Sequence, residues 1–247
     1  MTTTKVVPGM LIAVPAAEDV AKEAAARIAK VLREAVKARG KAAFALSGGD
    51  TPKQTYRHLA EEPDVDWSRI DLYWVDERAV PPTDDRSNYR WAKECLVDPA
   101  KIPESRVHRM RAEEKDLDAA AREYENVLRE GVAVGQGGVP SFDAMVLGVG
   151  DDGHTASLFP GQPTVEITDR FVVAVGETEG REMRLTLTAP VLEQARAVFV
   201  LAVGARKTPA LERVWSVSGS LRDTPARVIR NARGSIHWII DKAAGGM

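Results

Sequence analysis

The chain has one cysteine, Cys95, among its 247 residues. A lone thiol can form no disulfide within the chain and cannot supply a structural zinc site, so we expect a small buried side chain in a reducing compartment. Runs of about 18 apolar residues, the length that spans a membrane, are also missing. The first residues lack the basic segment and long apolar run of a secretion signal. These absences predict a cytoplasmic protein with no membrane partner.

An excess of charge of one sign is lacking as well. The sequence has 34 Lys and Arg residues against 36 Asp and Glu residues, which gives a formal net charge of -2. No dense stripe of Lys and Arg offers the positive field that a nucleic-acid backbone needs. We therefore expect no nucleic-acid partner, and any anionic ligand must be small and held locally. The sequence gives no indication of protein partners.

The rest of the composition is that of an ordinary globular protein. Hydrophobic residues make up 44% and charged residues 28% of the chain, so neither disorder nor an unusual environment is needed to explain it. A length of 247 residues suits one large α/β domain. We therefore expect a single domain over residues 1–247, and we interpret the glycine-rich stretch 131–140 as a loop within it.

The pattern along the chain alternates between helices and strands. Apolar residues at helical spacing predict a helix over residues 18–39, which Gly40 ends. Further helices are predicted up to Leu59, over 88–96 and over 116–129, and strands over 41–46, 71–75, 142–150, 197–204 and 235–240. This alternation predicts an α/β fold: a mostly parallel, Rossmann-like, doubly wound sheet with helices on both faces and right-handed crossovers.

In such a sheet, ligands bind beyond the carboxyl ends of the strands, and four loops there carry unusual residues. The first has the sequence SGGDTP. Thr51 and Gln54 have the spacing of a capping box and Pro52 suits the first helical position, so a helix is expected to start here. Gly48 and Gly49 let backbone N–H groups approach an anion at the helix N-terminus. The loop is either a phosphate cradle or an ordinary strand-to-helix turn.

Two further loops carry charge at the same edge. The run Asp76, Glu77, Arg78 follows a buried strand, where charged side chains are useful to a site but can also be simply solvated. The loop GARKTP has two cations between a strand and a helix, so Lys207 is placed to meet an anionic ligand. A solvated surface lysine is the alternative for Lys207.

The fourth loop, GVGDDGHTAS, contains a literal GxGxxG after a strand. That pattern is typical of dinucleotide sites, but Asp151 and Asp152 would repel a pyrophosphate and Pro160 leaves little room for a long helix. A metal site is not expected either, because no second histidine lies near His154 and HExxH is absent. We therefore expect neither a cofactor nor a metal.

His154 lies in a polar, glycine-rich turn beyond a strand rather than on an apolar face. This position favours general acid or base chemistry over a purely structural role. A serine nucleophile is not indicated, because GxSxG is absent and nothing else supports Ser157.

These segments, in this order, resemble the 6-phosphogluconolactonase family, which is related in fold to glucosamine-6-phosphate deaminase. The resemblance is carried by LSGGDTP, YWVDER with the downstream SNY, LGVGDDGHTASLFPG, RLTLTAPVL and VGARK, so it spans nearly the whole chain. DGHTASLFPG is the most specific of them. The first loop of the family usually has SGGST, so Asp50 stands here where a serine is usual.

The resemblance implies hydrolysis of 6-phospho-D-glucono-1,5-lactone to 6-phospho-D-gluconate in the oxidative pentose phosphate pathway, without cofactor or metal. It makes His154 the general base that activates water on an already activated ester. Asp152 is the expected orienting partner of the imidazole, and Lys207 is expected to meet the phosphate, with Arg184 as the second candidate. The other expected substrate-binding residues are Gly48, Gly49, Thr51, Asp76, Arg78 and Gly150.

Three rivals remain open from the sequence. The deaminases carry a catalytic acid after the DGH segment, whereas TASLFPG has no carboxylate. Some transcription regulators use the same fold as a non-catalytic sugar-phosphate sensor, but they add a helix-turn-helix for which we expect no space in the short, basic-poor N-terminus. The third rival is a nicotinamide-dependent dehydrogenase, which only the GxGxxG motif suggests.

Overall fold

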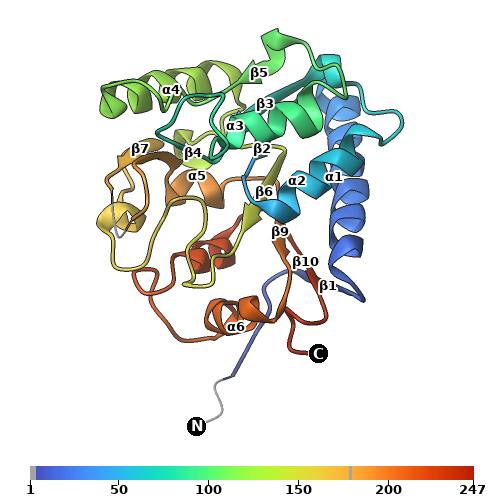
Figure 1. Cartoon of the computed structure of the whole chain (residues 1–247), viewed down its shortest axis with the longest axis vertical. Helices are drawn as coiled ribbons and strands as arrows, with labels where there is room; N and C mark the ends of the chain where they lie inside the picture. Colours follow the sequence, from blue (N-terminus) through green and yellow to red (C-terminus); the bar gives the residue numbers. More distant parts are fainter. Residues whose placement is uncertain (1–3, 178–179) are drawn as a thin grey trace.

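A computed structural model describes residues 4–177 and 180–247 (Figure 1). Its main element is a parallel sheet of seven strands in the order β1-β10-β9-β6-β2-β3-β5. The strands are β1 (Met10–Val14), β2 (Ala42–Leu46), β3 (Ile70–Trp74), β5 (Val107–His108), β6 (Ala144–Gly148), β9 (Ala197–Ala202) and β10 (Ser235–Asp241). The mostly parallel α/β fold is confirmed, although the sequence pattern misses the two edge strands, β1 and β5.

Both faces of the central strands are covered. Every residue of β2, β3 and β9 is buried, which is the pattern of strands covered on two sides. Helices α1 (Ala17–Arg39) and α2 (Asp50–Ala60) lie together beside the central strands in Figure 1, and α5 (Ala189–Glu193) lies on the opposite side. Further helices are α3 (Asn88–Ala92), α4 (Leu117–Gly131) and α6 (Thr208–Trp215).

Helix α1 confirms the helix predicted over residues 18–39. Its first turn carries Glu18 and Asp19, whose negative charge suits the positive end of the helix dipole. Gly40 follows with a φ of 77°, a left-handed conformation that glycine adopts without strain, and this ends the helix.

The helices predicted over 88–96 and over 116–129 are confirmed with shifted ends. The helix expected over 88–96 splits into α3 and a π-helical turn, Lys93–Val97. The helix expected over 116–129 is α4, whose N-cap is Asp116. The Asp116 carboxylate accepts a hydrogen bond from the backbone N–H of Ala119 at 2.9 Å, which satisfies a donor of the first turn.

A second sheet has three antiparallel strands, β4 (Asp76–Arg78), β8 (Arg184–Leu187) and β7 (Val172–Val175), in the order β4-β8-β7. The expectation that a loop begins at Asp76 is therefore wrong. A strand this short cannot show an alternating pattern, and its partner β8 lies far along the chain, so no local signal announces it. The ladder places Asp76 opposite Thr186 and Arg78 opposite Arg184.

The hydrophobic core contains buried side chains from both sheets, among them Phe44, Leu185 and Val200. Cys95 belongs to this core with 1% of its surface exposed, as expected for the lone thiol. Among residues 4–177 and 180–247, no helix is long and apolar enough to span a bilayer.

Candidate active site

A cavity of about 420 Å³ opens at the carboxyl ends of β2, β6 and β9. The loops after these strands line it, together with parts of β4 and β8, as expected at the edge of a parallel sheet. All the predicted site residues except Asp152 contribute to the lining. They are Gly48, Gly49, Thr51, Asp76, Arg78, Gly150, His154, Arg184 and Lys207.

The SGGDTP segment, here called the glycine loop, leads into α2 two residues earlier than predicted. Gly49 is the N-cap with a φ of 107°, which strongly favours glycine, and Asp50 is the first helical residue. The capping box predicted for Thr51 and Gln54 is therefore wrong, and Pro52 is not the first helical residue. In the described part of the chain no side chain caps α2, so its first N–H groups are left for an anion in the cavity.

Asn88 holds the glycine loop from the other side. A Cβ at Gly48 would lie 1.8 Å from Asn88 Oδ1, so only glycine fits there. The side-chain nitrogen of Asn88 donates to the backbone oxygen of Asp76 at 2.9 Å and to Asp76 Oδ1 at 3.1 Å. Asn88 also lines the cavity. The loop patterns miss this residue, although it lies in the SNY segment that carries part of the resemblance.

Asp76 presents a carboxylate that is only 4% exposed at the wall of the cavity. Ser157 Oγ donates to its Oδ2 at 2.7 Å, and Arg184 Nη1 lies 3.7 Å from the same oxygen. Ser157 is itself fully buried. Its hydroxyl therefore holds Asp76 in place and is not presented to a substrate as a nucleophile.

Two guanidinium groups face each other across the small sheet. Arg78 and Arg184 are directly opposite in the ladder of β4 and β8, an arrangement in which like charges repel. The Nε atoms of both are buried without a hydrogen-bond partner among the described residues. Burial lowers the pKa of Arg184; the nearby Asp76 opposes this effect, and Arg78 adds to it. An anion bound between the two arginines would relieve their repulsion.

His154 is bonded to Asp152 through its Nδ1. The distance from Nδ1 to Asp152 Oδ1 is 2.6 Å, and the His154 backbone N–H donates to the same oxygen at 3.0 Å. This contact leaves Nε2 as the ring nitrogen for a substrate in the cavity. Arg181 donates to Asp152 Oδ2 at 3.0 Å, so both carboxylate oxygens have partners. No motif in the sequence points to Arg181.

The contacts of Asp152 keep it ionised. Burial acts to raise its pKa, but hydrogen bonds from the side chain and backbone of His154, the charge of His154 and a hydrogen bond from Arg181 outweigh it. The pKa of Asp152 therefore lies well below its ordinary value. An ionised Asp152 favours the tautomer with hydrogen on Nδ1, which leaves a lone pair on Nε2. Gly150 permits this turn, because a Cβ there would lie 2.1 Å from His154 Nδ1.

Lys207 lines the cavity but already has a partner. Its Nζ lies 2.7 Å from Asp151 Oδ1, and Arg206 Nε lies 3.7 Å from the other oxygen of Asp151. The hydrogen bond from Lys207 lowers the pKa of Asp151 against the effect of burial. Arg206, the other cation of the GARKTP loop, lines the cavity as well. A phosphate at this end would therefore share Lys207 with Asp151.

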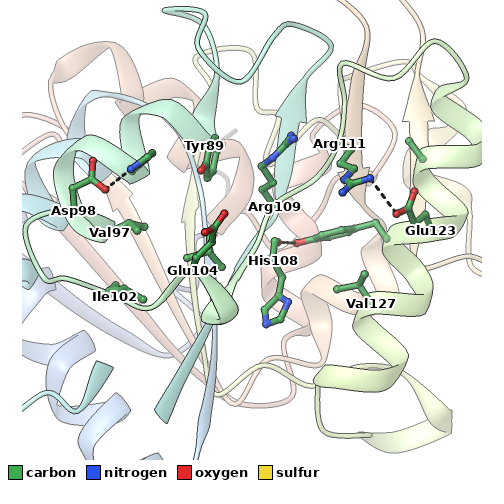
Figure 2. A pocket seen from close by; sticks show the side chains of 14 residues that line it. Tyr89, Val97, Asp98, Ile102, Glu104, His108, Arg109, Arg111, Glu123 and Val127 are labelled. Carbon is green, nitrogen blue, oxygen red and sulfur yellow. Dashed lines mark hydrogen bonds and ion pairs between the residues drawn. The ribbon is translucent and has the colours of Figure 1, made fainter. Parts of the chain in front are cut away.

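A larger cavity, of about 620 Å³, lies elsewhere, along β5 and between the α3 region and α4 (Figure 2). None of the predicted site residues lines it. Its cations have acidic partners: Lys93 pairs with Asp98, Arg109 with Glu113 and Arg111 with Glu123. We therefore assign the chemistry to the smaller cavity, which is lined by His154 together with Arg78 and Arg184.

The GVGDDGHTAS loop also raises a metal site and a dinucleotide site as alternatives. The described residues contain no group of three or more His, Cys, Asp and Glu side chains placed to hold a metal ion. The segment after Gly150 forms turns and a short 3-10 helix, Pro163–Glu166, in place of the long helix of a dinucleotide site. The GxGxxG motif is therefore not followed by the long helix that a dinucleotide site requires.

Comparison with known proteins of similar sequence and structure shows the family of this chain. The family model for glucosamine-6-phosphate isomerases/6-phosphogluconolactonase matches residues 15–238. A 6-phosphogluconolactonase of Synechocystis is 40% identical, over 89% of this chain and 88% of its own. One of Streptomyces coelicolor is 37% identical, over 92% and 90%. The structure of 6-phosphogluconolactonase from Trypanosoma brucei superposes with a TM-score of 0.85 at 25% identity, covering 99% of both chains. The chain thus belongs to the glucosamine-6-phosphate isomerase/6-phosphogluconolactonase family.

Proposed function

We propose that the protein hydrolyses 6-phospho-D-glucono-1,5-lactone to 6-phospho-D-gluconate, as a cytoplasmic enzyme of the oxidative pentose phosphate pathway. The observation that carries this proposal is the hydrogen-bonded pair of His154 and Asp152 at a cavity lined by cations. A base next to several cations suits the hydrolysis of an anionic substrate. The relatives that are 40% and 37% identical are both 6-phosphogluconolactonases, which supports the choice of substrate.

The reaction needs a base and a place for negative charge. His154 Nε2 takes a proton from a water molecule, whose oxygen attacks the carbonyl carbon of the lactone. Asp152 stabilises the imidazolium that forms. The carbonyl oxygen becomes an oxyanion, and the facing guanidinium groups of Arg78 and Arg184 are the proposed stabilisers. When the bond from the carbonyl carbon to the ring oxygen breaks, the imidazolium gives its proton to that oxygen, and the new carboxylic acid loses its proton to water.

A covalent intermediate is no part of this mechanism. A six-membered lactone is an activated ester, so water that is polarised by one positioned base can open it. The burial of Ser157 and its bond to Asp76 agree with this, since they keep the Ser157 hydroxyl from acting as a nucleophile.

The phosphate is proposed to lie between the glycine loop and Lys207. The first N–H groups of α2 and the amides of Gly48 and Gly49 suit a phosphate, because the N-terminus of a helix carries a partial positive charge. Thr51 is in the first turn of α2 and also lines the cavity. Lys207 adds a full charge, which it shares with Asp151 in the absence of substrate.

A direct hydrolysis assay tests the function. Freshly made 6-phosphogluconolactone is incubated with the protein, and the rate is corrected for spontaneous ring opening. We expect rapid hydrolysis and no ammonia release from glucosamine 6-phosphate, because the TASLFPG run has no carboxylate to act as the acid of the deaminases. A lactone rate equal to that of the buffer would refute the proposal.

The histidine variant tests the mechanism. We expect His154→Asn to stay folded and to bind 6-phosphogluconate but to lose about two to four powers of ten in turnover, the usual contribution of a positioned base. If the folded variant turned over like the wild type, the base would be another group.

A further inference from the structure

Glu77 lies between two cavity residues but points away from the cavity. Side chains alternate along a strand, so Asp76 and Arg78 share one face of β4 and Glu77 takes the other. Accordingly, Asp76 and Arg78 line the cavity and Glu77 does not. Only 3% of Glu77 is exposed. Burying a carboxylate is unfavourable unless its oxygens are hydrogen-bonded, so its contacts must compensate for the lost water.

Four donors converge on this carboxylate. Oε1 accepts from the backbone N–H groups of Arg78 at 2.7 Å and Asn88 at 2.8 Å. Oε2 accepts from the backbone N–H of Tyr89 at 2.7 Å and from Ser87 Oγ at 3.0 Å. Burial raises the pKa of Glu77, and these hydrogen bonds limit the rise. Because the donors other than Arg78 lie at the start of α3, Glu77 ties the N-terminus of that helix to β4.

Asn88 connects this anchor to the cavity. Its backbone N–H is held by Glu77, while its side chain donates to both the backbone and the carboxylate of Asp76. The same side chain packs so closely on Gly48 that no Cβ fits between them. Glu77 therefore fixes Asn88, and Asn88 in turn fixes both Asp76 and the glycine loop at Gly48.

We propose that Glu77 is a positioning residue that acts through Asn88 to hold Asp76 at a fixed distance from the glycine loop, and so orients the sugar ring in front of His154. This inference rests on the proposed lactone hydrolysis. Asp76, as a carboxylate, accepts hydrogen bonds from the hydroxyl groups of the sugar. Small errors in the placement of reacting groups lower turnover strongly, so the effect of Glu77 belongs mainly in kcat.

The test is a double-mutant cycle. Glu77→Gln keeps the shape, but its amide nitrogen meets a backbone donor whichever oxygen it replaces. We expect kcat on the lactone to fall about 10- to 100-fold, with KM changed by less than about 3-fold. If Glu77 acts through Asn88, the same substitution lowers kcat by less than about 3-fold in the Asn88→Ala background. An equal fall in both backgrounds would overturn the inference.

Glu125→Gln is a matched control. Glu125 is 8% exposed, and its Oε1 accepts from the backbone N–H groups of Phe171 and Val172 and from Arg170 Nε, at positions outside the cavity lining. We expect it to lower the melting temperature as Glu77→Gln does, but to leave kcat within about 2-fold of the wild type. A fall in kcat as large as that of Glu77→Gln would assign both effects to lost stability and overturn the inference.

Ser87→Ala replaces Glu77→Gln in the cycle if the latter does not fold. It removes one donor to Glu77 and keeps the carboxylate. We expect it to lower kcat about 3-fold, and to have no effect once Asn88 is alanine; an equal effect in both backgrounds would overturn the inference.

The lactone assay of the wild type separates failure of the proposed function from failure of the role proposed for Glu77. If the wild type does not hydrolyse the lactone, the proposed function fails and the role of Glu77 with it; if it does and the cycle is additive, only the role of Glu77 fails.

Discussion

At the scale of single residues, the contacts of Asp152 make its charge a source of stability. Its pKa lies below the ordinary value in the folded protein because the bonds from His154 and Arg181 outweigh the effect of burial. A carboxyl group whose pKa is lower in the folded than in the unfolded chain stabilises the fold above the unfolded pKa of about 3.9. That contribution is lost as the pH falls through the lower, folded value. Asp152 therefore stabilises the protein at neutral pH and ceases to do so in acid.

We predict that Asp152→Asn lowers the free energy of unfolding at neutral pH, and that the difference from the wild type shrinks below about pH 4. The Asp152 side chain is 32% exposed, so solvent screening limits the difference to on the order of 1 kcal/mol. Denaturant unfolding of both proteins from neutral to acid pH measures it. A difference that stayed constant over that range would show that the charge of Asp152 does not contribute to stability.

The Lys207→Ala variant tests whether Lys207 recognises the phosphate of the substrate. We predict that Lys207→Ala loses about 1.5–3 kcal/mol of phosphate recognition, which lowers the preference for 6-phosphogluconolactone over plain gluconolactone about 10- to 100-fold. The ratio of kcat/KM on the two substrates is the measurement, because remote binding energy can appear in kcat as well as in KM. Lys30→Ala is the control, since Lys30 pairs with Glu34 on α1 and both lie outside the cavity lining. An unchanged preference in Lys207→Ala would reassign Arg184 from the oxyanion to the phosphate.

At the scale of elements, the sequence predicts the loops after β2, β6 and β9 because each follows a buried run and breaks at glycines. These loops contain Gly48, His154 and Lys207, which the structure brings to one cavity. The small antiparallel sheet could not be predicted, since its strands are short and pair across long stretches of chain. Ser157 and Arg181 could not be found either, because the residues they hold are distant in sequence and only the fold brings them together.

The start of α2 shows how a local rule can fail. Thr51 and Gln54 have capping-box spacing, but Gly49 takes a left-handed conformation and starts the helix earlier. As a result Gly49, and not Thr51, is the N-cap, and Asp50, and not Pro52, occupies the first helical position and lines the cavity. Its carboxylate suits the positive end of α2, but it also competes with a phosphate for the same N–H groups.

We predict that Asp50→Ser lowers KM for 6-phosphogluconolactone about 2- to 5-fold and lowers the melting temperature slightly, because the charge that repels the phosphate also favours the helix. KM for plain gluconolactone should stay the same. Steady-state kinetics on both substrates and a melting curve measure these effects. A higher KM for the phosphorylated lactone would mean that the Asp50 carboxylate assists binding.

At the scale of the whole molecule, the net charge is -2, yet the lining of the cavity has more cations than carboxylates. The charged side chains of the cavity lining are the cations Arg78, Arg184, Arg206 and Lys207 and the carboxylates Asp50 and Asp76. The parallel topology produces this concentration, because the loops after several strands meet at one edge of the sheet. A positive cavity attracts a phosphorylated substrate even on an acidic protein.

We predict that added salt lowers kcat/KM for 6-phosphogluconolactone but not for plain gluconolactone. Raising the ionic strength from about 0.01 M to 0.15 M shortens the Debye length from about 30 Å to about 8 Å, so attraction between the cavity and an approaching dianion is screened. We expect kcat/KM to fall about 3- to 10-fold for the phosphorylated lactone. Lys207→Ala should respond more weakly, because its cavity has one cation fewer. If kcat/KM rose with salt, the acidic charge of the whole molecule, and not the cationic cavity, would govern the approach of the substrate.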